Sequence, residues 1–109
     1  MDVNTLKSVY FIGAGGIGMS ALVRYFLSIG KKVAGYDRTP SELTQKLIAE
    51  GAAIHYEENV EGIPNEFLDP NTTLIIYTPA IPSKHAELIY FQEHGFTIQK
   101  RSQVLGMLT

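Results

Sequence analysis

Short apolar runs alternate along the chain with segments in which apolar residues recur at helical spacing. A continuous apolar run bounded by turn residues is typical of a buried strand. On this basis we predict strands at residues 9–12, 33–36, 53–56, 73–77 and 96–99. Because strands that alternate with helices form parallel sheets, the pattern predicts a mostly parallel five-stranded sheet with helices on both faces.

The segments between these strands carry helix signals. In Thr39-Pro40-Ser41-Glu42, Thr39 is the predicted N-cap and Glu42 completes a capping box. Ser83 is expected to cap a later helix, and the polar stretch 57–71 to form a loop. The predicted apolar stripes are Leu22, Tyr25, Phe26 and Ile29; Leu43, Leu47 and Ile48; and Leu88, Ile89 and Phe91. Glycines are expected to end these helices at positions 30, 51 and 95.

Length and composition restrict the possible partners. The 109 residues, 45% of them hydrophobic, predict one globular domain over residues 1–109. A net charge of −2 favours neither nucleic acid nor an anionic membrane, and no apolar run is long enough to cross a bilayer. There is no cysteine, and His55, His85 and His94 lack metal-ligand spacing and are expected in surface or loop positions. With no signal-peptide pattern, a cytoplasmic location is expected.

A glycine-rich segment follows the first predicted strand and opens the first predicted helix. Residues 13–18 read Gly-Ala-Gly-Gly-Ile-Gly and match the pattern G-x-G-x-x-G, and Asp37 closes the next strand. This context is typical of a phosphate site in a Rossmann-like, doubly wound αβα fold. The first glycine permits a tight turn, the next two let a phosphate approach, and the last packs the helix on the sheet.

The unpaired N–H groups of the first helical turn would face the ligand, with the positive end of the helix dipole behind them. Asp37 fits three roles: an acceptor for ribose hydroxyls, an acceptor for a uracil N–H, or a partner for the helix start after Thr39. Arg38 suits either a phosphate or solvent, and the turn at residues 78–80 is expected to form the opposite wall. The candidate binding residues are Gly13, Gly15, Gly16, Ile17, Gly18, Met19, Ser20, Asp37, Arg38, Thr78 and Ala80.

No nucleophile–base pair stands out, and the G-x-x-x-x-G-K-[ST] motif of ATP-binding loops is absent. The sequence therefore predicts a domain that binds a ligand without catalysing a reaction. Two classes share this fingerprint: the NAD-binding domain of a dehydrogenase, and a non-enzymatic nucleotide-sensing regulatory module.

A third class is indicated by a family resemblance. Residues 10–20 closely resemble the opening of the UDP-N-acetylmuramate–L-alanine ligases, whose signature reads G-x-G-G-I-G-M-S. Residues 33–37 resemble the V-x-G-x-D strand of that family, residues 77–82 its S-x-A-[IV] turn, and residues 100–105 its R-x-x-x-L segment. The resemblance spans the whole chain, and general NAD folds do not require the Met19-Ser20 pair.

The resemblance implies the amino-terminal, UDP-sugar-binding domain of a three-domain ligase. Such ligases join L-alanine to UDP-N-acetylmuramate in peptidoglycan precursor synthesis, using ATP and Mg²⁺ in a central domain. It therefore implies no cofactor within residues 1–109, and UDP-N-acetylmuramate, the ATPase domain and the carboxy-terminal domain as partners. It also implies that the glycine-loop amides face the diphosphate and that Asp37 lies near the uracil. The chain departs from the family in one loop, where Glu57-Glu58 stand in place of a Gly-His pair.

Overall fold

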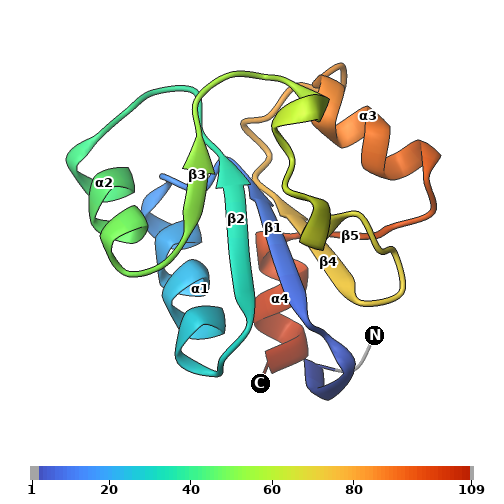
Figure 1. The fold of residues 1–109 in the computed structure, drawn as a ribbon, viewed down its shortest axis with the longest axis horizontal. Coiled ribbons are helices and arrows are strands. Elements are labelled where there is room, and N and C mark those ends of the chain that lie inside the picture. Colours follow the sequence, from blue (N-terminus) through green and yellow to red (C-terminus); the bar gives the residue numbers. More distant parts are fainter. Residues whose placement is uncertain (1–2, 109) are drawn as a thin grey trace.

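The computed structural model describes residues 3–108, and the side chains of all of these except residues 3, 17, 107 and 108. Its centre is a five-stranded sheet in the order β3-β2-β1-β4-β5, with every neighbouring pair parallel (Figure 1). The strands are β1 (Ser8–Ile12), β2 (Lys32–Tyr36), β3 (Ala53–His55), β4 (Thr73–Tyr77) and β5 (Thr97–Lys100). The predicted α/β fold with a five-stranded sheet is confirmed, and all of its pairings are parallel.

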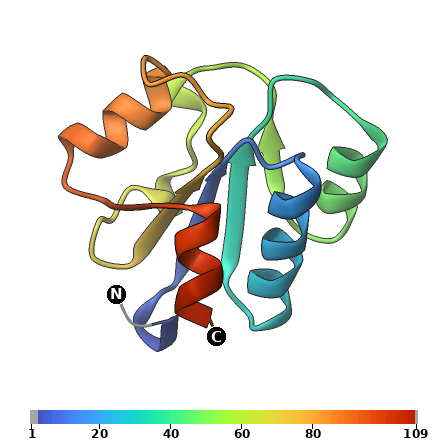
Figure 2. The ribbon, with the colours of Figure 1, turned by 180° about the vertical axis from the view of Figure 1, so that it is seen from behind.

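Helices cover both faces of the sheet. They are α1 (Ile17–Ser28), α2 (Glu42–Ala49), α3 (Ala86–Glu93) and α4 (Arg101–Leu108), with 3₁₀ turns η1 (Val3–Thr5), η2 (Val60–Gly62) and η3 (Asn65–Phe67). Figure 2 shows α1, α2 and α4 on one face, whereas α3, η2 and η3 lie on the other (Figure 1). Among the described residues, no helix is both long and apolar enough to cross a membrane.

Side chains alternate between two hydrophobic cores along each central strand. In β1, Val9 and Phe11 pack in the core under α1 and α4, whereas Tyr10 and Ile12 pack in the core under α3. All five residues of β1 are buried, because parallel strands covered on both faces have no solvent side. The register aligns Ile12 with Tyr36 of β2 and with Tyr77 of β4, so three strands end together at one edge.

Two predicted helix starts are wrong. α2 begins after Ser41, not Thr39: the Ser41 hydroxyl accepts from Thr44 N–H at 3.1 Å, and the Thr44 hydroxyl accepts from Ser41 N–H at 2.9 Å. The Thr39 N–H is instead held by the Asp37 carboxylate at 3.2 Å, which delays the helix by two residues. α3 is capped by His85 rather than Ser83.

The predicted apolar stripes are also only partly buried. Among them, Leu22, Phe26, Leu47, Leu88 and Phe91 enter the cores. Tyr25, Ile29 and Ile48 are 39%, 41% and 42% exposed, because these helices bury a narrower face than the spacing suggested. The helix stops at positions 30, 51 and 95 are confirmed, since each of these glycines has a positive φ.

The position of the α2 cap can be tested by two substitutions. We expect Ser41→Ala to lower the free energy of unfolding by about 1 kcal/mol, because it removes the side chain that caps the helix. Thr39→Ala should change it by less than about 0.5 kcal/mol, because Thr39 is exposed and contributes its backbone N–H to Asp37. Urea unfolding of both variants checks this, and the opposite ranking would place the cap at Thr39.

Candidate functional site

A cleft of about 540 Å³ lies where the carboxyl ends of β1, β2 and β4 meet. This is the edge at which open α/β sheets bind their ligands. Six predicted binding residues line the cleft: Gly13, Gly16, Asp37, Arg38, Thr78 and Ala80. Five further lining residues were not predicted: Tyr36, Glu58, Ile81, Pro82 and His85.

The other predicted residues lie in or beside the glycine loop. The side chains of Met19 and Ser20 are buried, so only their backbone lies at the helix start. Ser20 N–H is already bonded to Gly16 O at 2.8 Å. The side chain of Ile17 lies outside the described part of the structure, although its backbone begins α1. Gly15 and Gly18 do not line the cleft. Each is packed so closely against another part of the chain that a Cβ would overlap it.

The glycine loop makes the turn that the motif predicts. Gly13 has a φ of 97°, which only glycine adopts readily, and its N–H and that of Ala14 donate to Tyr36 O at 2.8 and 3.0 Å. Gly16 is the N-cap of α1 and supplies no side-chain cap. The first turn of α1 therefore presents N–H groups and the positive helix end without a capping side chain in the described structure.

Asp37 ties the glycine loop to the strand beside it. Its Oδ2 accepts from Gly15 N–H at 2.5 Å, and its Oδ1 accepts from Thr39 N–H at 3.2 Å. The role of Asp37 as a partner for the chain after β2 is therefore present in the structure. A Cβ on Gly15 would overlap this carboxylate and lie 2.7 Å from Thr44 Cγ2. Asp37 and Thr44 thus leave no space for a side chain at Gly15, and the phosphate contact predicted for that glycine stays a prediction.

Gly18 makes room for a residue from the far end of the chain. A Cβ at this position would overlap the guanidinium of Arg101, the first residue of α4, rather than the sheet. The sequence predicted packing of Gly18 on the sheet, whereas the atoms nearest to a Cβ at this position belong to Arg101. Among the described residues, no carboxylate lies within ion-pair distance of Arg101. A guanidinium beside the positive end of α1 favours a bound anion.

The exit of β4 forms the opposite wall, as predicted from the strand order. Thr78 Cγ2 would lie 2.5 Å from a Cβ on Gly13, so the two strand exits are in direct contact. Thr78 N–H donates to Ile12 O at 3.4 Å, and Ile81 N–H donates to Thr78 O at 3.0 Å. These bonds hold the proline-containing turn in the wall of the cleft.

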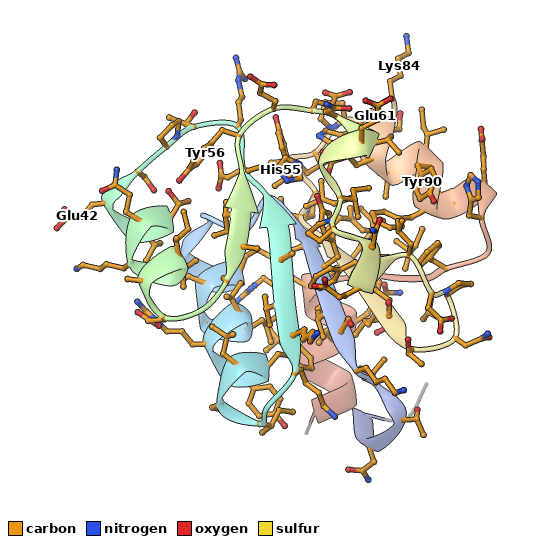
Figure 3. All side chains as sticks on the ribbon, viewed as in Figure 1. Glu42, His55, Tyr56, Glu61, Lys84 and Tyr90 are labelled. Atoms are coloured by element: carbon orange, nitrogen blue, oxygen red, sulfur yellow. The ribbon has the colours of Figure 1, made fainter. Side chains whose placement is uncertain are left out.

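A buried polar cluster centred on Glu87 was not predicted from the sequence. Glu87 is fully buried and accepts from Tyr10 Oη at 2.5 Å, from Asn59 N–H at 3.1 Å and from His55 Nε2 at 2.8 Å. Burial, and secondarily the Glu87 charge, raise the pKa of Tyr10 far above its ordinary value. Figure 3 shows His55 at the carboxyl end of β3, beside the loop that this cluster anchors. The only sequence signal was a carboxylate among the apolar residues of α3.

The expectation that all three histidines have surface or loop roles is wrong for His55, which lies in strand β3 and bonds the buried Glu87. His85 lies in the loop before α3, but it is buried there. Its side chain is 2% exposed, and its Nδ1 accepts from Glu87 N–H at 3.2 Å, which caps α3. Glu58, in the segment expected to form a loop, accepts from Ala86 N–H at 2.8 Å at the same helix start. Among the described residues, no cluster of three or more His, Asp or Glu side chains is suited to a metal ion.

The parallel sheet, the glycine loop and the cleft define a Rossmann-like α/β domain. Residues 8–109 match the Mur ligase family, catalytic domain. The chain is 78% identical over its whole length to the UDP-N-acetylmuramate–L-alanine ligase of Phocaeicola vulgatus, and 60% identical to that of Parabacteroides distasonis. The chain belongs to the Mur ligase family. It spans 24% of the length of each of these relatives.

A solved structure agrees with this assignment. The fold is similar to that of the UDP-N-acetylmuramate–alanine ligase MurC of Thermotoga maritima, with a TM-score of 0.79 and 26% identity. The match covers 90% of this chain and 21% of that one. The family resemblance found in the sequence is confirmed, and the dehydrogenase and regulatory alternatives are set aside.

The packing at Gly15 can be tested by substitution. We expect Gly15→Ala to lower the free energy of unfolding by about 1–3 kcal/mol, because its Cβ would overlap the Asp37 carboxylate. Gly16→Ser is the matched control, since a Cβ there meets no atom closer than 3.7 Å and serine is a good N-cap. Thermal melting compares the two variants. Equal stability of Gly15→Ala and the wild type would show that the Asp37 contact does not restrict this position.

Proposed function

We propose that the protein containing this chain is a UDP-N-acetylmuramate–L-alanine ligase, and that residues 1–109 bind the UDP portion of its substrate. The 78% identity to a ligase of that name, over the whole chain, supports the activity. The observation that carries the binding role is the uncapped first turn of α1, which opens beside the cleft at the carboxyl edge of the sheet.

The diphosphate is proposed to lie on the glycine loop. Backbone N–H groups at a helix start bind phosphate oxygens well, because they combine direct hydrogen bonds with the helix dipole. Arg101 and Arg38 supply positive charge from two other segments, next to Gly18 and in the cleft wall respectively. Thr78 and Ala80 in the opposite wall would then limit where the sugar leaves the cleft.

ATP and Mg²⁺ are proposed to bind in another part of the protein. The P-loop G-x-x-x-x-G-K-[ST], which holds ATP phosphates, carries a lysine after its last glycine, whereas this loop continues Gly18-Met19-Ser20. No lysine is among the described residues that line the cleft. This chain would therefore hold and orient the substrate, while an ATPase domain and a carboxy-terminal domain complete the reaction in the cytoplasm.

Ligand choice tests this proposal by amide chemical shifts. On titration with UDP or UDP-N-acetylmuramate, we expect the amide signals of residues 17–19 to shift, because the diphosphate binds at their N–H groups, whereas Gly15 N–H already donates to Asp37. Inorganic diphosphate should shift the same signals. NAD is the control, and its binding should be at least about tenfold weaker, a difference of about 1.4 kcal/mol. Tighter binding of NAD than of UDP, or shifts confined to residues far from the loop, would contradict the proposal.

A further inference from the structure

His85 carries a buried side-chain nitrogen in the wall of the cleft. The residue is 3% exposed and lines the cleft, and its Nε2 has no hydrogen-bond partner among the described residues. Buried polar side-chain atoms are paired in the large majority of cases, so an unpaired one in a cleft wall indicates a missing partner. The ring itself is fixed, because it packs edge to face against Tyr36 with ring centroids 4.7 Å apart.

The cap of α3 determines which hydrogen-bonding role this nitrogen has. Nδ1 of His85 accepts from Glu87 N–H at 3.2 Å, so it must present its lone pair. A neutral imidazole then carries its proton on the other nitrogen. His85 Nε2 is therefore an N–H donor, held in place by the same bond that begins the helix.

An acceptor lies beside this donor. Glu58 Oε2 accepts from Ala86 N–H at 2.8 Å, which fixes the carboxylate at the start of α3. Its Oε1 lies 3.8 Å from His85 Nε2, which is too far for a hydrogen bond between them. Glu58 also lines the cleft, so a fixed donor and a fixed acceptor stand next to each other in one wall.

We propose that His85 and Glu58 together bind the uracil base of the ligand. His85 Nε2–H donates to a uracil carbonyl oxygen, and the Glu58 carboxylate accepts from the adjacent ring N–H. This inference rests on the proposed function and names the residues that select the base. It also moves the base contact away from Asp37, whose two carboxylate oxygens already accept from Gly15 and Thr39.

The pairing predicts discrimination between pyrimidines. Cytosine has an unprotonated ring nitrogen where uracil has the N–H, so in the same pose its lone pair faces the Glu58 carboxylate. Two acceptors that face each other repel, and neither has a hydrogen bond. The wild-type chain should therefore bind UDP roughly tenfold or more tightly than CDP.

Glu58→Gln is the most selective test, because it replaces the acceptor proposed for the uracil N–H and keeps the bond from Ala86 N–H at the start of α3. The glutamine oxygen continues to accept from Ala86 N–H, while its NH₂ group replaces Oε1 beside His85. By calorimetric titration, the affinity for UDP should fall roughly tenfold or more, and the ratio of UDP to CDP affinity should decrease or reverse. The affinity for inorganic diphosphate should not change. Glu57→Gln is the matched control, with the same charge change in an exposed neighbour that does not line the cleft, and should behave as wild type.

His85→Asn tests the donor separately. Asparagine is a good N-cap, so its side-chain oxygen can replace Nδ1 at Glu87 N–H, but nothing replaces Nε2. UDP affinity should again fall roughly tenfold, with diphosphate affinity retained. Thermal melting of each variant confirms that the fold is kept.

The outcomes separate this inference from the proposed function. If the wild type binds neither UDP nor inorganic diphosphate, the proposed function fails and the base assignment fails with it. If the wild type binds both, and Glu58→Gln and His85→Asn retain wild-type UDP affinity and selectivity, the base assignment alone is wrong. Loss of diphosphate binding in these variants would also overturn it, because their effect would then be structural. A change in UDP–CDP selectivity caused by Asp37→Asn instead would return the base contact to Asp37.

Discussion

The parallel pairing of β1 with both β2 and β4 is the constraint on which the rest of the structure depends. Ile12 aligns with Tyr36 on one side and with Tyr77 on the other, so three chain segments leave the sheet at the same edge. Parallel strands need crossover helices, and these bury both faces of β1. The loops after these strands therefore meet above the sheet, and the cleft is a consequence of the register.

The cleft combines two chemically different halves. On the side of Gly16, backbone N–H groups, the α1 dipole and the guanidinium of Arg101 favour a doubly charged anion. On the side of α3, a fixed imidazole N–H and a fixed carboxylate stand against Tyr36, which suits an uncharged ring with polar edges. A nucleoside diphosphate has this same division of charge, which links the glycine loop to the residues that cap α3.

Local patterns in the sequence predicted the strands and the glycine turn at Gly13, because each depends on short-range periodicity or backbone conformation. The opposite wall was predicted from the strand order of doubly wound sheets. Tertiary contacts decided the rest. Asp37 holds Thr39 N–H, so the helix starts two residues later than its capping pattern indicated. His85 and Glu58 come from segments far apart in sequence and meet only at the start of α3, so neither carried a local signal of a site.

The central claim is that UDP lies across the cleft with its diphosphate on the glycine loop. A crystal structure of the chain with UDP tests it most directly. We predict phosphate oxygens within hydrogen-bond distance of N–H groups in residues 17–19, and the base within hydrogen-bond distance of His85 Nε2 and the Glu58 carboxylate. A diphosphate bound elsewhere, such as the hollow of about 600 Å³ that includes Lys7 and Lys31 near the amino ends of β1 and β2, would contradict the account.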